Sequence, residues 1–178
     1  EKNNPEIIKM LLEKNANIYV KNSNEESPFK MARESKNEEI ISLLEEAMKS
    51  NIYRAIEEGD LEKIQKSIDE GADVNWKIDR DGNTPLHLAV LNNNVQMVKL
   101  LLEHNPNLTM ENEEDNTPLD IAIKQKNNEI VNIIEMKMKM KNILRLAVEN
   151  NNVILAKEMI AAGVDVNTVI DDKKNTPL

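Results

Sequence analysis

Few side chains in this sequence could carry out catalysis, and those that could stand alone. The chain has no cysteine, so a thiolate nucleophile and a zinc–thiolate site are excluded. Its two histidines are His87 and His104. A general base needs a nucleophile or a carboxylate placed beside it. The sequence motif that contains His87, Thr84-Pro85-Leu86-His87-Leu88-Ala89, supplies no such partner. We therefore predict no catalytic residue and no enzymatic activity.

Acidic side chains are the remaining candidates for a ligand site. Asp79-x-Asp81-x-Asn83 resembles the start of a calcium-binding EF-hand loop. The sixth position, however, is Thr84 where that loop needs glycine, and the twelfth is Val90 where it needs glutamate. Other acidic clusters have the composition of an ordinary solvated surface, at 57–58, 111–115 and 171–172. We predict no metal site and no cofactor.

One tripeptide recurs and divides the chain into repeats. Its copies are Thr84-Pro85-Leu86, Thr117-Pro118-Leu119 and Thr176-Pro177-Leu178, with a variant at Ser27-Pro28-Phe29. The fullest unit continues with His87-Leu88-Ala89 and later with Val98-Lys99-Leu100-Leu101. Longer segments recur as well, since residues 6–20 match 96–110 and residues 27–48 match 117–138 at an offset of 90.

This order of motifs resembles the ankyrin repeat, a hairpin turn followed by two antiparallel helices with the signature Thr-Pro-Leu-His-x-Ala and a later Val-x-x-Leu-Leu. The resemblance implies an all-α fold, a helical solenoid of stacked helix-turn-helix repeats with short hairpin loops. It also implies that His87 hydrogen-bonds the neighbouring hairpin and that the function is to bind other proteins.

Helix boundaries can be assigned from local signals. An outer helix is predicted over 95–103, because Gln96, Lys99 and Glu103 share one polar face and the other faces are apolar. The matching helix near 6–13 repeats this pattern, so its apolar side chains are expected to be packed. Inner helices are predicted to start where proline follows a capping threonine, at Pro85, Pro118 and Pro177. Left-handed helix ends are predicted at Asn15, Gly71, Asn105 and Gly163.

The spacing of the inner-helix alanines indicates that two hairpins are missing. Ala32, Ala55, Ala89, Ala122 and Ala147 are separated by 23, 34, 33 and 25 residues. The two short intervals have lost the roughly ten residues that form the hairpin in this family. Residues 136–141 alternate Met and Lys as a strand would, but both flanks are helical in pattern. We predict a helix end and a tight connection at each junction, 47–51 and 136–142.

These boundaries give a single array over residues 1–178. Its units are 1–22 (partial), 23–49, 50–78, 79–111, 112–140, 141–170 and 171–178 (partial). Solenoids close with polar capping repeats, and neither end of this sequence shows one. We expect the chain to be a segment of a longer array.

Ankyrin repeats grip their partners with hairpin tips and with the exposed side of the inner helices. Carried over residue by residue, the resemblance implies a mostly polar set of partner-binding candidates: Glu57, Glu58, Arg80, Asp81, Asn83, Leu91, Asn92, Glu113, Glu114, Asn116, Lys124, Gln125, Glu149 and Asn150. The acidic members are expected to extend along the array. Trp76 lies beside a hairpin, where its ring either packs on that hairpin, the favoured interpretation, or anchors a partner.

Charge restricts the class of partner. The chain carries 32 acidic and 23 basic side chains, a net charge of -9, which disfavours nucleic acid and anionic lipid. We expect a protein partner with a basic or neutral surface, and leave the oligomeric state open. No apolar run approaches the roughly 20 residues that cross a bilayer, and no signal peptide is visible. We expect a soluble protein in the cytoplasm of the producing or host cell.

The function predicted from the sequence is a protein-interaction scaffold. The alternative is a substrate-recruiting arm of a larger multidomain protein, such as a secreted bacterial effector, with catalysis outside this segment. A third class, a structural spacer or self-assembling array, is suggested by the open ends.

Overall fold

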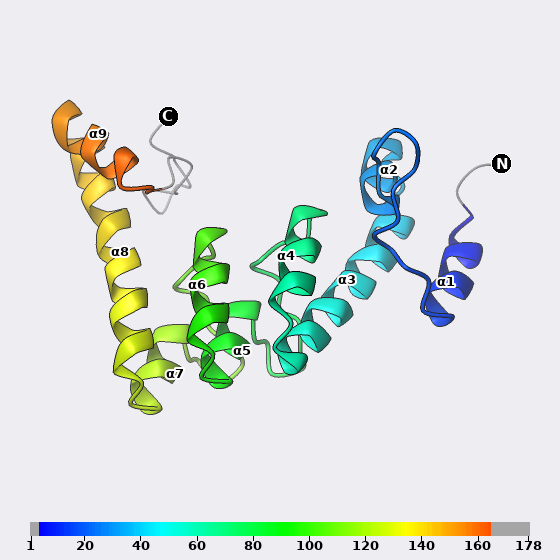
Figure 1. Cartoon of the computed structure of the whole chain (residues 1–178), viewed down its shortest axis with the longest axis horizontal. Helices are drawn as coiled ribbons and strands as arrows, with labels where there is room; N and C mark the ends of the chain where they lie inside the picture. The colour runs from blue at the N-terminus through cyan, green and yellow to red at the C-terminus, as the bar shows by residue number, and fades with distance from the viewer. Residues whose placement is uncertain (1–3, 165–178) are drawn as a thin grey trace.

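The computed structural model describes residues 4–164, and all regular structure within that range is α-helical (Figure 1). In order, the helices are α1 (Pro5–Glu13), α2 (Pro28–Ser35), α3 (Glu38–Glu58), α4 (Leu61–Asp69), α5 (Pro85–Leu91), α6 (Val95–Glu103), α7 (Pro118–Lys124), α8 (Asn128–Glu149) and α9 (Val153–Ala161). The predicted all-α, ankyrin-type architecture is confirmed, including the two missing hairpins.

The inner helices start where the tripeptides predict. Helices α5 and α7 begin at Pro85 and Pro118, and the preceding threonine caps each one. The backbone N–H of Asp120 donates to the Thr117 hydroxyl at 3.2 Å, and the Thr117 N–H donates back to the Asp120 carboxylate at 2.9 Å. The Thr117 hydroxyl also donates to this carboxylate at 2.5 Å. The hydroxyl bond first, and then the bond from the N–H, lower the pKa of Asp120. The third predicted start, Pro177, lies outside the described residues.

The predicted left-handed helix ends are also confirmed. The backbone φ angle is 57° at Asn15, 52° at Asn105, 102° at Gly71 and 80° at Gly163. Asparagine tolerates this conformation better than most residues with a Cβ atom. The chain can therefore end helices with asparagine at positions where other repeats use glycine.

The predicted tight connections at the two junctions are wrong, because both junctions are continuous helix. Helix α3 runs through residues 47–51, and α8 runs through 136–142. Neither helix contains Gly or Pro, and the junction residues are mostly strong helix formers. In α3 the buried side chains Ile40, Leu44, Met48 and Ile52 recur every four residues across the junction. The unit boundaries assigned at 49/50 and 140/141 thus fall inside helices.

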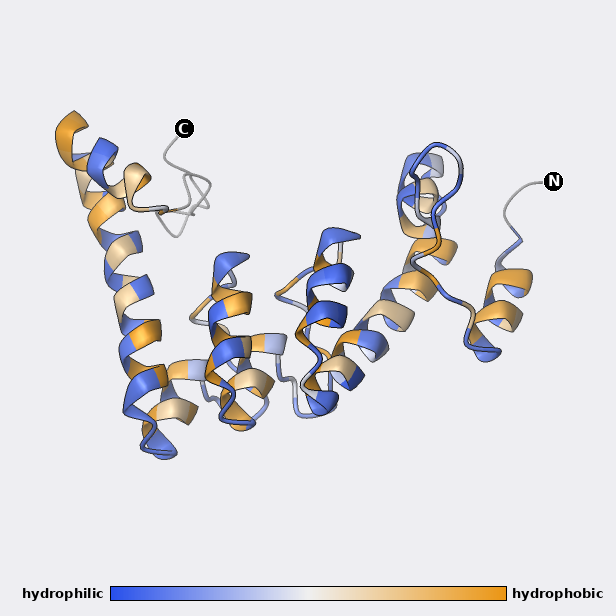
Figure 2. Ribbon diagram, viewed as in Figure 1, coloured by the Kyte–Doolittle hydropathy of each residue, from blue (hydrophilic) through white to orange (hydrophobic). Residues whose placement is uncertain are grey.

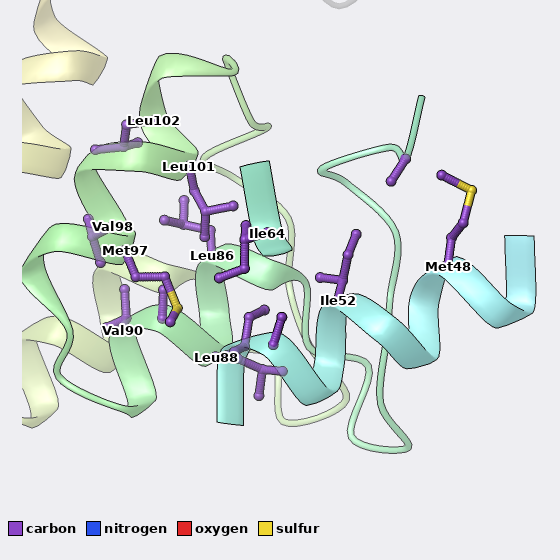
Figure 3. Close-up of a cluster of buried hydrophobic side chains, with 14 of the residues drawn as sticks. Met48, Ile52, Ile64, Leu86, Leu88, Val90, Met97, Val98, Leu101 and Leu102 are labelled. Carbon is purple, nitrogen blue, oxygen red and sulfur yellow. The ribbon is translucent and has the colours of Figure 1, made fainter. Parts of the chain in front are cut away.

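Between these two fused helices lies a regular block of the solenoid. Its inner layer is the second half of α3, then α5, then α7, and its outer layer is α4, α6 and the first half of α8. Ile64 of α4, Leu86 of α5 and Leu101 of α6 point toward one another in its core (Figure 3), and all three are at most 1% exposed. Each such side chain contributes roughly 1.5–3 kcal/mol of burial free energy.

The regular stacking stops at α7. Ile123 of α7 is 53% exposed, whereas its equivalent one repeat earlier, Val90 of α5, is fully buried. Val90 is covered because α7 packs on α5. The helix that would cover Ile123 in the same way is the second half of α8, which continues away from α7 instead of turning back (Figure 1).

Helix α1 departs from its predicted packing. Its equivalent in the regular block, α6, buries Met97 and Leu101, but Ile7 and Leu11 at the matching positions of α1 are 55% and 50% exposed. Within the described residues α1 packs chiefly against α3, and no inner helix lies on its other side. The same sequence pattern therefore produces a buried helix only where an inner helix covers it.

Side chains bridge the first junction in place of a hairpin. The Tyr19 hydroxyl lies 2.7 Å from Ser67 Oγ of α4 and accepts from Asn51 Nδ2 of α3 at 3.3 Å. Lys66 Nζ lies 5.4 Å from the centroid of the Tyr19 ring. A salt bridge of 3.0 Å joins Lys21 to Glu70. The loop after α1 is thereby fixed to the helix pair beyond the junction.

The two hairpins of the regular block are tied together through His87, as the resemblance implies. His87 Nδ1 accepts from the Thr84 N–H at 3.2 Å, so Nε2 carries the proton and donates to the Asn116 carbonyl at 3.0 Å. The residue is fully buried, and desolvation lowers its pKa. The neutral ring is thus the form that joins hairpin 70–84 to hairpin 104–117.

We expect a proline at exposed Lys139 to test whether α8 is continuous. Lys139→Pro removes an N–H that a helix needs and clashes with the preceding turn, which costs about 3 kcal/mol. Urea unfolding followed by circular dichroism should show this loss relative to Lys139→Ala. Equal stability of the two variants would indicate that the chain turns at this position.

We also expect stability to fall as the pH drops through the ordinary histidine value of 6.5. Because the pKa of His87 is lower in the folded state, the unfolded chain binds more protons below that value, and protonation favours unfolding. The melting temperature should fall between about pH 7.5 and about pH 5.5, and this fall should shrink in His87→Gln. His104→Gln serves as the control. An identical fall in His87→Gln would contradict the assignment.

Candidate protein-interaction surface

The predicted hairpin-tip residues form one exposed group in the regular block. Arg80, Asp81, Glu113 and Glu114 are all exposed, and the Glu113 N–H donates to the Asp81 carbonyl at 2.9 Å. The tips approach so closely that a Cβ atom on Gly82 would lie 3.2 Å from the Glu113 backbone nitrogen, and the φ of Gly82 is +70°. The left-handed φ and this close approach both favour glycine where one tip stacks on the next.

The predicted inner-helix residues form a second row at the ends of three adjacent helices. Asn92 Nδ2 donates to the Ile56 carbonyl at 3.5 Å, and Gln125 Nε2 donates to the Leu91 carbonyl at 3.0 Å. Each amide thus satisfies a carbonyl at the end of the preceding inner helix. Leu91 remains 42% exposed beside them. These bonds fix the spacing of the row.

Glutamates 57 and 58 end the same row at α3, and both are exposed. Glu58 Oε2 lies 2.8 Å from Lys63 Nζ, and this hydrogen bond is the largest cause of the raised pKa of Lys63. A similar pair joins Lys77 to Glu113 at 3.1 Å. Exposed pairs of this kind add little stability. They partly neutralise the acidic surface, although Glu57, Asp81 and Glu114 form no salt bridge with another described residue.

Two predicted candidates are buried and hold the hairpins together. Asn83 is 4% exposed and Asn116 is 7% exposed. Asn83 Nδ2 donates to Asp79 at 2.8 Å, and Asn83 Oδ1 accepts from Asn112 of the next hairpin at 2.9 Å. Asn116 Oδ1 accepts from Lys124 Nζ at 2.5 Å. This last bond joins the end of α7 to its own hairpin.

Trp76 lies against the core and the first fused helix, whereas the packing interpretation placed its ring on the adjacent hairpin. Its side chain is half-buried and packs on the hydrophobic core. Lys49 Nζ of α3 lies 5.6 Å from the ring centroid, within cation–π range. The ring therefore contacts the first fused helix, which limits the surface it can offer to a partner.

The structure does not bring Glu149 and Asn150 to this surface. They end α8, whereas Gln125 lies just before its start. At 1.5 Å per residue the two ends of α8 are about 30 Å apart. The predicted extension of the acidic face along the whole array is therefore interrupted at the second fused helix.

The partners of the acidic residues were missed by the sequence reasoning. The motif comparison assigned no role to Lys63 and Lys77, which lie on neither an inner helix nor a hairpin tip. Lys63 follows Glu58 by five residues across a helix end, so no helical i, i+4 spacing marks the pair. Lys77 and Glu113 are 36 residues apart, and their proximity follows only from the stacking of the hairpins.

This surface offers charged and amide groups for contact. Within residues 4–164 no group of three or more His, Cys, Asp or Glu side chains has the arrangement of a metal site. None of the described helices is both long and apolar enough to span a bilayer. Hydrophilic residues dominate the hairpins (Figure 2), so the surface presents charges and amides around the exposed Leu91.

Comparison with known proteins places this geometry in a family. The family model for ankyrin repeats, in three copies, matches residues 52–143, which coincide closely with the regular block. Mouse (Mus musculus) Rabankyrin-5 is 31% identical over 119 residues, 61% of this chain and 10% of that protein. The I-Kappa-B like protein G2 of Microplitis demolitor bracovirus is 41% identical over 75 residues, 42% of this chain and 45% of that protein.

A human (Homo sapiens) protein named Palmitoyltransferase ZDHHC13 is 42% identical over 59 residues, 33% of this chain and 10% of that protein. The chain thus spans less than half the length of each of these relatives. The family match covers more than half of this chain and agrees with its stacked helix pairs, capping threonines and bridging His87. The chain belongs to the ankyrin-repeat family.

Proposed function

We propose that this chain is a protein-interaction scaffold whose partner docks on the regular block. Ankyrin repeats generally mediate protein–protein interaction and are typically non-catalytic. The observation that supports this site best is the alignment of the exposed tips and helix ends in consecutive units. The proposed contact residues are Glu57, Glu58, Arg80, Asp81, Leu91, Asn92, Glu113, Glu114, Lys124 and Gln125. The proposed units at this site are 50–78, 79–111 and 112–140.

The proposed partner carries a basic surface. Asp81, Glu113 and Glu114 lie together at the tips, with Glu57 and Glu58 at the end of the helix row. The chain as a whole has a net charge of -9. A negative surface accelerates association with a positive one and disfavours nucleic acid. Leu91 supplies an apolar contact among these charges.

A second candidate function is a recruiting arm of a larger protein. It is favoured by the length of the relatives, of which this chain spans 10% in two cases and 45% in the third. In this case the same surface would hold a substrate, and any chemistry would lie elsewhere in the parent protein. Assaying the parent protein for modification of its captured partner distinguishes the two candidates.

Site-directed photo-crosslinking in the full-length parent protein tests the location of the site. A photoreactive residue replaces Leu91 at the proposed surface or, as a control, Glu39 in the first turn of α3, which is also exposed. We expect a protein to be captured from position 91 and not from position 39. Capture from position 39 alone would place the site elsewhere.

Charge reversal tests the chemistry of the captured partner. Glu113→Lys with Glu114→Lys should lower the association rate roughly tenfold at low salt, because electrostatic steering is lost. The difference should fade as screening shortens to about 10 Å at 0.1 M salt. The matched control is Glu38→Lys with Glu39→Lys, an exposed acidic pair away from the tips. Surface plasmon resonance should show no such loss for the control, and equal rates for both variants would contradict the proposal.

A further inference from the structure

A groove lies between outer helices α6 and α8, away from the proposed interaction surface. Its volume is about 380 Å³, and its lining is mostly apolar, with Leu102, Ile133, Met136 and Met140 beside Lys99, Glu103, Asn132 and Lys137. Ile133, Met136 and Met140 recur at helical spacing along one side of α8. Met136 is 63% exposed. No described segment covers this part of α8.

The fused helix creates the groove. Helix α6 ends at Glu103, where its chain turns into hairpin 104–117, but α8 continues to Glu149. The two helices pack together, and α8 then extends past the end of α6 (Figure 1).

The part of α8 beside the groove is basic, unlike the chain as a whole, which has a net charge of -9. Residues 136–148 contain four cations and no acidic residue, and of these Lys137 lines the groove. Lys141 Nζ donates to the Pro106 carbonyl at 3.5 Å, and Arg145 is paired with Glu149 at 3.5 Å. Hydrophilic and hydrophobic bands alternate along this part of α8 (Figure 2). The lining includes one acid, Glu103. Lys99 is paired with Glu129 at 3.5 Å, whereas Lys137 has no ion pair with any other described residue.

The composition of the groove is specific to the second junction. At the offset of 90 that relates the two copies, Met136 and Lys137 correspond to Glu46 and Ala47. Both copies of this helix stay continuous through the junction. A methionine at 136 and a lysine at 137 are therefore not required for the helix to continue through the junction. We look for their role in the groove that they line.

We propose that this groove binds an amphipathic helix of a partner protein that carries apolar side chains at i and i+4 and acidic residues beside them. Two outer helices present a trough into which a third helix can lay its apolar face. Methionine side chains adapt to varied apolar shapes, and lysine stems can extend over the apolar contact while their charged ends meet carboxylates. Nucleic acid fits less well, because its phosphates would make no apolar contact with the methionine and leucine side chains of the groove.

A randomised library of helical peptides displayed on phage is the probe. It is panned on the wild-type chain, and the selected peptides are then tested against Met136→Glu with Lys137→Ala, which installs the residues of the first junction. We expect selected peptides with paired apolar residues and an excess of Asp and Glu. They should bind this variant at least tenfold more weakly. Met10→Glu, a control at a methionine of similar exposure (65%) on α1, should bind them as the wild type does.

Further measurements test whether the groove itself is the binding site. Glu113→Lys with Glu114→Lys should leave peptide binding unchanged, since those residues lie on the other surface. Selected peptides rich in Lys and Arg, or peptides that bind the groove variant as well as the wild type, would overturn the proposal. So would wild-type dimerisation in sedimentation experiments that the groove variant abolishes, because a second copy of the chain would then occupy the groove.

Discussion

The reversal of the chain between one helix pair and the next is the constraint on which this structure depends. An inner helix runs antiparallel to the outer helix before it, so the chain must turn back between them. Hairpins 70–84 and 104–117 provide that turn. Where the hairpin is missing, α3 and α8 continue in one direction and carry the next helix away from the stack. The exposed Ile123, the distant Glu149 and the groove beside Met136 all follow from this continuation.

The hairpins also carry the hydrogen bonds that make the regular block a unit. Within the described residues, α5 is the inner helix that has both a hairpin before it and an inner helix on each side. Residues 85–90, which form most of this helix, are all buried. His87 and Asn83 extend this burial to the hairpins through bonds to the next loop. At the first junction, Tyr19 and Lys21 connect the flanking loop to α4 and its following turn instead. Where the hairpin is missing, the contacts of Tyr19 and Lys21 thus connect neighbouring units in place of hydrogen bonds between hairpins.

Local features were predictable from the sequence because local physics decides them. Thr84 and Thr117 cap helices, and Asn105 adopts a left-handed conformation, whatever lies around them. The continuity of α3 was missed, although Ile40, Leu44, Met48 and Ile52 keep one helical spacing through the junction. The burial of Asn83 and Asn116 was not predictable, because it depends on how closely the adjacent hairpins stack. The same holds for Ile7 and Leu11, whose exposure depends on a neighbouring helix and not on their own pattern.

The two proposed surfaces differ in layer, charge and chemistry. One presents carboxylates and amides at the tips and inner-helix ends, and the other presents methionines and lysines between outer helices. They share no residue, so a basic partner and an acidic helix could be bound together without competing. Helix α8 links them, because its first half closes the regular block and its middle forms one wall of the groove. An occupant that contacts both α6 and the middle of α8 would hold the fused helix at a fixed angle to the block, and so fix the direction in which the following helix pair extends.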